Sequence, residues 1–147
     1  MILSQLLARL DYHTSASPEQ LKTLEVTSVT DDSRSVVPGS LFVALQGVHV
    51  DGNSFIPKAV AAGARVCVVQ QLPAEQLPGV LYLEVDSAAE ALGLLSAAWH
   101  GYPAEQLQVI GVTGTNGKTT IATLLWRLFR SLGYKAGLLS TVCNYVD

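Results

Sequence analysis

A glycine-rich turn between an apolar run and an amphipathic stretch constrains this chain more than any other feature of its sequence. The apolar run covers residues 107–112, and the turn reads Gly-Thr-Asn-Gly-Lys-Thr-Thr over residues 114–120. The following segment repeats apolar residues at helical spacing until Gly133. The order strand, turn, helix is typical of α/β proteins, in which such turns bind ligands at the ends of parallel strands.

The turn has the composition that a nucleotide phosphate requires. Amide hydrogens at the start of a helix converge on an anion, the helix dipole adds positive potential, and glycines allow close approach. Lys118 can reach the β- and γ-phosphates, and the Thr119 hydroxyl can coordinate Mg²⁺. We therefore predict ATP and Mg²⁺ as cofactors, with Lys118 and Thr119 as catalytic residues and Thr119 as the metal ligand. The predicted phosphate-binding residues are Gly114, Thr115, Asn116, Gly117, Lys118, Thr119 and Thr120.

The turn departs at one position from the usual phosphate-loop pattern G-x-x-x-x-G-K-[ST]. Val112 stands where that pattern has its first glycine, so the loop is a variant form. The alternative interpretation is an ordinary strand-to-helix turn that happens to contain Gly-Lys-Thr. The dinucleotide pattern G-x-G-x-x-G does not occur in the sequence.

The first hundred residues also alternate between β-rich and helical patterns. The expected strands are residues 25–30, 41–45, 66–69 and 80–85. One helix is expected over residues 55–62 with Ser54 as its cap, and another after Ser87, which has capping-box spacing to Glu90.

A break at residues 100–103, His-Gly-Tyr-Pro, is the best candidate for a domain boundary. We predict an N-terminal α/β domain over residues 1–102 and the start of a second, parallel-sheet domain over residues 103–147. In the second part, strands at 107–112 and 135–139 flank one helix. Two parallel strands and one helix cannot bury both faces of a sheet, so this domain is expected to be incomplete.

Composition excludes several classes of function. The net charge is −3, charged residues make up 14% and hydrophobic residues 49%, and no basic run suggests a nucleic-acid surface. The N-terminus does not resemble a signal peptide, and no apolar stretch is long enough for a membrane span, so a cytoplasmic location is expected. Cys67 and Cys143 lack metal-ligand spacing and are expected to act as small apolar residues.

Two further polar segments follow expected strands. They are Asp-Asp-Ser-Arg at residues 31–34 and Gly-Val-His-Val-Asp-Gly at residues 47–52. Loops at the carboxyl ends of strands in α/β sheets are common binding sites. The plainer alternatives are a turn whose arginine is paired locally and, for His49, a solvated loop histidine. His13 and His100 have no motif around them.

The joint occurrence of three stretches resembles the Mur ligases, which are ATP-dependent amide ligases of peptidoglycan synthesis. The first joins Asp32-Ser33-Arg34 to residues 38–45 and Gly47, the second runs from Asp51-Gly52 to Gly63-Ala64, and the third is residues 109–120. Within the family, the form of the loop and the later Thr141-Val142-x-Asn144 resemble the ligases that add the third residue of the stem peptide. Ser140 and Cys143 depart from that pattern, because glycines are common there.

The resemblance implies a function and a set of substrate contacts. The N-terminal domain would hold the UDP part of UDP-N-acetylmuramoyl-L-alanyl-D-glutamate, and ATP would convert the substrate carboxylate to an acyl phosphate that an incoming amino acid attacks. No nucleic acid or membrane partner is implied. The substrate residues carried over by the resemblance are Asp31, Ser33, Val48, His49 and Val50.

The family is about three times longer than this chain, so the resemblance implies an N-terminal part that is inactive in isolation. The residues that choose between meso-diaminopimelate and L-lysine are expected beyond Asp147. Three alternatives stay open at this point: the related ligase that adds D-alanyl-D-alanine, a small phosphate-loop NTPase or kinase, and a UDP-sugar-binding module without catalysis.

Overall fold

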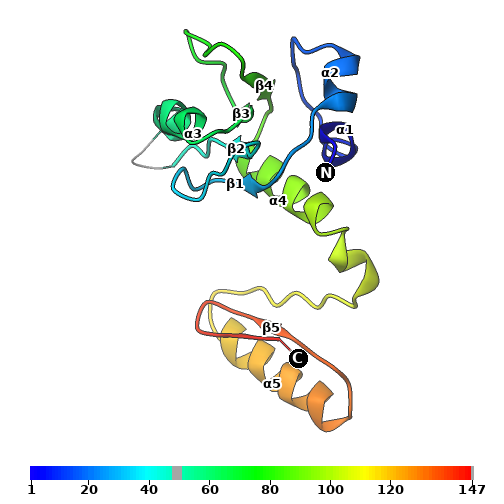
Figure 1. Ribbon diagram of the computed structural model, residues 1–147. Coiled ribbons are helices and arrows are strands. Elements are labelled where there is room, and N and C mark those ends of the chain that lie inside the picture. The colour runs from blue at the N-terminus through cyan, green and yellow to red at the C-terminus, as the bar shows by residue number, and fades with distance from the viewer. Residues whose placement is uncertain (48–50, 147) are drawn as a thin grey trace. The chain divides into compact units, whose positions relative to one another are not determined.

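A computed structural model describes residues 1–47 and 51–146 of the chain. The chain divides into two compact units, Met1–Leu107 and Gln108–Asp147 (Figure 1). Each unit is described separately below. Within the described residues, no helix has both the length and the apolar character needed to cross a membrane.

The first unit is built on a four-stranded sheet in which every strand is parallel to its neighbours. Its strands lie in sequence order: β1 (Val29–Thr30), β2 (Leu41–Val43), β3 (Val66–Val69) and β4 (Leu81–Glu84). The carboxyl ends of all four strands therefore meet at one edge of the sheet, where ligands bind in folds of this class.

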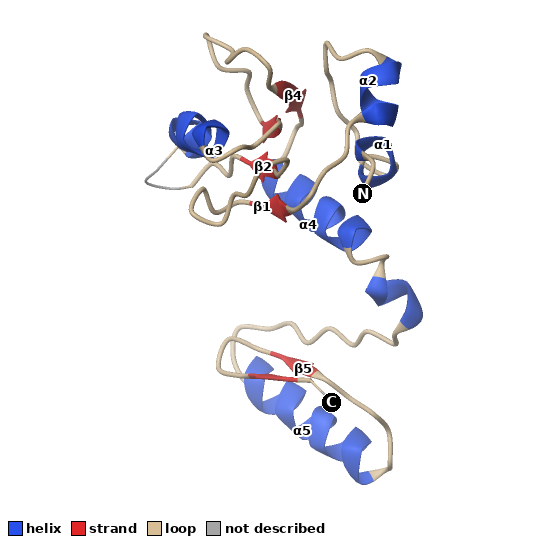
Figure 2. Cartoon of the chain, viewed as in Figure 1, coloured by secondary structure: helices blue, strands red, loops and turns tan. Residues whose placement is uncertain are grey.

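Helices cover both faces of this sheet. Helices α1 (Leu3–Leu6) and α4 (Ala88–Trp99) pack on one face, and α3 (Ile56–Ala61) packs on the other (Figure 2). Neighbouring residues of β2 point to opposite faces, so that Leu41 joins the cluster under α4 while Phe42 joins the cluster under α3. Because both faces are covered, β3 is a continuous buried run, as the sequence predicts.

Helix boundaries in this unit follow from local capping. Helix α2 (Pro18–Thr23) has a reciprocal capping box between Ser17 and Gln20. The Ser87 hydroxyl caps α4 by accepting a hydrogen bond from the Glu90 amide at 3.3 Å. A short 3-10 helix, η2 (Pro103–Gln106), follows α4.

Ser54 does not cap the helix that follows it, and this prediction is wrong. The chain first forms a 3-10 turn, η1 (Gly52–Phe55), and the Asp51 carboxylate caps it by accepting from the Asn53 amide at 2.9 Å. The Ser54 hydroxyl instead donates to the Asp51 carbonyl at 2.7 Å. Helix α3 consequently begins at Ile56, one residue later than predicted.

The strand predicted over residues 25–30 is shorter than expected. Only Val29 and Thr30 pair with β2. The Val26 amide donates to the Met1 carbonyl at 2.8 Å, and Glu25 forms an isolated bridge with Ile2. The first half of the predicted strand thus pairs with the N-terminus rather than with the sheet.

The second unit consists of helix α5 (Lys118–Ser131) and a small antiparallel pair, β5 (Leu138–Leu139) and β6 (Asn144–Tyr145). The Trp126 indole donates to the Ala136 carbonyl at 2.7 Å and stacks on the Tyr145 ring at 4.6 Å between centroids. These contacts hold the hairpin against α5.

The predicted pair of parallel strands does not form in this unit. Residues 107–112 are not a strand, because a strand needs a hydrogen-bonded neighbour and none pairs with them among the described residues. The predicted strand 135–139 is reduced to β5, whose partner is the antiparallel β6. The Ser140 hydroxyl donates to the Cys143 carbonyl at 2.7 Å, which supports the tight turn between the two strands.

The apolar face of α5 remains open within its unit. Leu124 is 58% exposed and Leu132 is 63% exposed, and Ile110 in the preceding segment is 59% exposed. Of the described residues in this unit, only Leu138 is buried. Residues 108–146 therefore do not close a core of their own.

Candidate functional site

The predicted phosphate loop folds as an open turn at the start of α5. Gly114 and Gly117 have φ values of 146° and 77°, a region that residues with a Cβ rarely adopt. Gly117 is also the N-cap of the helix, and the Ile121 amide makes the bond to its carbonyl at 2.9 Å. The amides of residues 118–120 therefore precede the first turn's hydrogen bonds and are the donors that an anion would use.

The Lys118 ammonium group lies over the loop. Its Nζ donates to the Gly114 carbonyl at 2.5 Å and to the Thr115 carbonyl at 3.3 Å. The group is exposed, as are residues 113–117. The lysine thus places its charge beside the amides at the helix start, and the turn is accessible to an anion.

Thr119 lies in the first turn of α5 and is partly exposed. A threonine hydroxyl is one oxygen ligand, and Mg²⁺ in nucleotide sites takes most of its other ligands from phosphates and water. Among the described residues, no group of three or more His, Cys, Asp or Glu side chains could hold a metal. The contribution of Thr119 to a Mg²⁺ site remains a prediction.

The loop after β1 is a turn whose arginine is paired locally, which confirms the plainer interpretation for Arg34. The Arg34 guanidinium donates to both Asp32 carboxylate oxygens, at 2.8 to 3.1 Å, and its backbone amide donates to the same carboxylate at 2.9 Å. Of the two residues predicted to contact substrate, Asp31 is exposed and Ser33 is buried. The Asp32–Arg34 pair thus stabilises the turn that contains Asp31 and Ser33.

The Arg34 guanidinium and backbone amide lower the pKa of Asp32 to about 2. Because the pKa in the folded protein is below the ordinary value of 3.8, the pair stabilises the turn above pH 4, and this contribution is lost as the pH falls towards 2. We expect Arg34→Ala to raise the Asp32 pKa part of the way towards 3.8, because the guanidinium is lost while the backbone amide of residue 34 still donates to the carboxylate. Carboxyl ¹³C chemical shifts followed through a pH titration would measure both values, and an unchanged pKa in the variant would contradict the assignment.

Val48, His49 and Val50 lie outside the described residues, so their predicted contact with the nucleotide sugar remains a prediction. They follow β2 in sequence, and Asp31 and Ser33 follow β1. Both predicted segments therefore come after strands that end at the same edge of the sheet.

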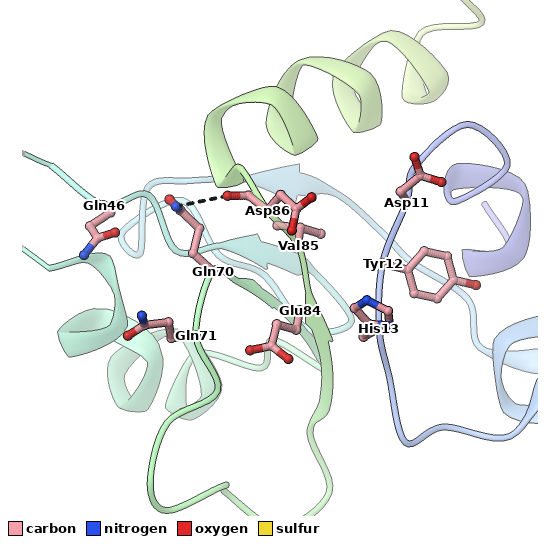
Figure 3. Close-up of a pocket in the computed structure, with 9 residues that line it drawn as sticks. All are labelled: Asp11, Tyr12, His13, Gln46, Gln70, Gln71, Glu84, Val85 and Asp86. Atoms are coloured by element: carbon pink, nitrogen blue, oxygen red, sulfur yellow. Dashed lines mark hydrogen bonds between the residues drawn. The ribbon is translucent and has the colours of Figure 1, made fainter.

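A polar cleft of about 490 Å³ at this edge was not predicted from the sequence (Figure 3). It is lined by residues 11–13, by Gln46 after β2, by Gln70 and Gln71 after β3, and by residues 84–86 at the end of β4. The sequence signal was position, because three of these segments lie at or shortly after the carboxyl ends of strands.

Residues 11–13 reach the cleft because they pair with β4. The His13 amide donates to the Glu84 carbonyl at 2.8 Å, and the Glu84 amide donates to the His13 carbonyl at 2.9 Å. The Thr14 hydroxyl adds a bond to the Tyr82 carbonyl at 2.8 Å. This segment therefore forms a fixed wall beside the sheet edge.

Known proteins match nearly the whole chain. The family model described as "Mur ligase family, catalytic domain" matches residues 25–100. The UDP-N-acetylmuramoyl-L-alanyl-D-glutamate–2,6-diaminopimelate ligase of Bacteroides fragilis is 47% identical over 91% of this chain. The UDP-N-acetylmuramyl-tripeptide synthetase of Deinococcus radiodurans is 45% identical over 97% of it. The chain spans 28% and 29% of the lengths of these two relatives.

Solved structures agree with the sequence comparison. A crystal structure of MurF from Acinetobacter baumannii is 30% identical, with a TM-score of 0.65 over 88% of this chain and 27% of the other. MurF from Thermotoga maritima, solved in complex with ADP, is 28% identical, with a TM-score of 0.54 over 75% of this chain and 25% of the other. The α/β fold predicted from the sequence is thereby confirmed, and the chain belongs to the Mur ligase family.

Proposed function

We propose that this chain supplies the nucleotide-sugar site and the ATP loop of a ligase that adds the third stem-peptide residue to UDP-N-acetylmuramoyl-L-alanyl-D-glutamate. The observation that carries the proposal is the open phosphate loop, in which Lys118 lies beside the free amides of α5. Two further observations support it. The chain belongs to the Mur ligase family, and its parallel sheet has a polar cleft at the carboxyl edge. The reaction would take place in the cytoplasm, where ATP is available.

The reaction within the family is inferred by comparing how similar this chain is to relatives that are named for different steps. A relative from Parabacteroides distasonis that is named a 2,6-diaminopimelate ligase is 49% identical to this chain over 84% of its length. A structure from Acinetobacter baumannii that is titled as a D-alanyl-D-alanyl ligase is 30% identical to this chain. Addition of the third residue is therefore favoured over addition of D-alanyl-D-alanine, and 2,6-diaminopimelate is favoured as the amino acid.

The loop supplies charge neutralisation to the phosphoryl-transfer step. A substrate carboxylate oxygen attacks the γ-phosphorus, the bond to the bridging oxygen breaks, and ADP leaves with the electron pair. The incoming neutral amine then attacks the acyl carbon, the bond from that carbon to the phosphate oxygen breaks, inorganic phosphate leaves with the electron pair, and the nitrogen loses a proton to solvent as the amide forms. Lys118 and the amides of residues 118–120 would hold the phosphate oxygens, and Thr119 would hold one Mg²⁺. The ion would neutralise charge on the β- and γ-phosphates.

The nucleotide sugar would bind at the carboxyl edge of the first unit. Asp31 and Ser33 come from the turn after β1, which the Asp32–Arg34 pair braces. Val48, His49 and Val50 follow β2 in sequence. This assignment places the UDP-sugar on one unit of the chain and the ATP loop on the other.

Calorimetric titration of the 147-residue chain tests the proposal. UDP-N-acetylmuramoyl-L-alanyl-D-glutamate should bind the wild-type chain, and Ser33→Tyr, which replaces the predicted hydroxyl contact with a much larger side chain, should weaken that binding at least tenfold. The matched control is Ser96→Tyr on α4, away from the sheet edge, which should leave the affinity unchanged. Binding of ATP alone would instead support a small kinase, and binding of the nucleotide sugar alone would support a non-catalytic module. The chain by itself is expected to form no amide product.

A further inference from the structure

The turn that follows α4 has an uncommon backbone conformation. Two consecutive residues lie in the left-handed region, Gly101 with φ of 72° and Tyr102 with φ of 54°. Glycine adopts this region readily, but a residue with a Cβ seldom does. Tyr102 is the one non-glycine residue with a positive φ in the part of the chain that the structure describes. Such a conformation persists where the surrounding contacts hold it in place.

Tyr102 is held by its backbone, by the core and by Arg9. Its amide donates to the Ala97 carbonyl at 2.7 Å, and its ring packs against the larger core cluster of the first unit. The Arg9 guanidinium lies over the same ring, 3.9 Å from the ring centroid, and also donates to the Glu105 carboxylate. One side chain from the start of the sequence therefore contacts both the turn and η2.

The position of Arg9 is itself fixed by the first unit. Arg9 lies in the turn after α1, where the Leu10 amide donates to the Leu7 carbonyl at 3.1 Å. Leu7 is buried, and Leu10 packs against the same core cluster as Tyr102. A guanidinium suits this place because its plane can stack on a ring while its N–H groups donate to a carboxylate, whereas an ammonium group has no such plane.

This support ends at the boundary of the first unit. Leu107 is the extended C-cap of η2, is 67% exposed, and is the last residue of the unit. Residues 108–113 make no hydrogen bond with any other residue that the structure describes. They lead directly into the predicted phosphate loop at residues 114–120.

We propose that Arg9 acts as a clamp, together with Tyr102 and Glu105, that holds η2 on the first unit and so sets residue 108 as the start of the segment connecting the two units. Without the clamp, residues 103–107 would join this segment and lengthen it. A longer connection between two units lowers the effective concentration of each for the other. The proposal concerns contacts within the first unit, so it does not depend on which ligands the chain binds.

Amide hydrogen exchange of the 147-residue chain tests the clamp, with each rate expressed as a protection factor relative to an unstructured peptide. The Glu105 amide donates to the Tyr102 carbonyl at 3.0 Å, so it should be protected in the wild-type chain, whereas residues 108–113 should not be. Arg9→Met removes the ion pair and the stacked cation, so the protection of Glu105 should fall about tenfold.

Arg65→Met is the matched control. Arg65 is an exposed arginine of the same unit that lies outside the clamp, and its replacement should leave the protection of Glu105 unchanged. Unchanged protection of the β3 amides in each variant verifies that the fold is retained.

Two further variants separate the clamp from a turn that is held by its backbone alone. Arg9→Lys keeps the charge but loses the stacking plane, so the protection of Glu105 should lie about threefold below that of the wild-type chain. Tyr102→Gly removes the ring but relieves the left-handed backbone, so a turn without a clamp would become more protected. The clamp predicts the reverse, a loss of protection at Glu105.

The outcomes decide the proposal without any ligand. Loss of protection in both Arg9→Met and Tyr102→Gly, with Arg65→Met unchanged, would support the clamp. Equal protection in the Arg9→Met and Arg65→Met variants would overturn it, as would exchange of the wild-type Glu105 amide at the rate of residues 108–113. Higher protection in Tyr102→Gly than in the wild-type chain would also contradict it.

Discussion

Replacing Lys118 with methionine is expected to weaken ATP binding by the 147-residue chain about 100-fold. The variant keeps roughly the length of the side chain but removes the charged donor that lies over the loop, 2.5 Å from the Gly114 carbonyl. Hydrogen bonds to charged groups contribute about 1.5–3 kcal/mol each, which corresponds to one or two orders of magnitude in affinity. Calorimetry with Mg·ATP measures the change directly.

Lys135→Met is the matched control for this experiment. Lys135 is an exposed lysine of the same unit that lies outside the phosphate loop. The control variant should bind ATP as tightly as the wild-type chain. Equal affinities for the Lys118 and Lys135 variants would show that the lysine of the loop has no part in nucleotide binding.

Gly52→Ala is expected to destabilise the first unit by about 3 kcal/mol, because the site has no room for a methyl group. A Cβ at Gly52 would overlap the Leu45 carbonyl oxygen and lie 2.7 Å from the Ala44 carbonyl carbon. These are backbone atoms at the end of β2, so they cannot move without disturbing the sheet. Urea unfolding followed through the amide signals of β3 gives the free energy of unfolding.

Gly93→Ala is the same chemical change, but it is expected to increase the stability of the first unit. Gly93 lies within α4, and a Cβ there would meet nothing within 4 Å. Alanine has a higher helix propensity than glycine, so the variant should be more stable than the wild-type chain by up to about 1 kcal/mol. If both alanine variants changed stability equally, the close contact at Gly52 could not be the cause.

The sequence predicted the elements that local chemistry determines. β3 is a short, apolar, β-branched run bounded by glycine and polar residues, and it folds as expected. Helix α4 begins after the predicted Ser87 cap. The predicted strand at residues 107–112 failed because strand formation depends on a partner, which the local pattern does not specify. The start of α3 was misplaced because Asp51 caps a 3-10 turn before the helix, within which the Ser54 hydroxyl donates to the Asp51 carbonyl.

The two parts of the candidate site differ in how far the sequence reveals them. The phosphate loop consists of seven consecutive residues, so its chemistry can be predicted without knowledge of the fold. The cleft instead joins residues 11–13, Gln46, 70–71 and 84–86, which are brought together only by the order of the strands and by the pairing of His13 with Glu84. No single one of these segments has a motif, so only the structure could assemble them.

The most direct test of the account is a pair of separate titrations of the ¹⁵N-labelled chain. We expect Mg·ATP to shift the amide signals of residues 114–120, and UDP-N-acetylmuramoyl-L-alanyl-D-glutamate to shift signals at the sheet edge, including that of Ser33. Two nucleotides would thereby be assigned to two units. The account would be contradicted if Mg·ATP left residues 114–120 unchanged, or if both nucleotides shifted the same set of signals.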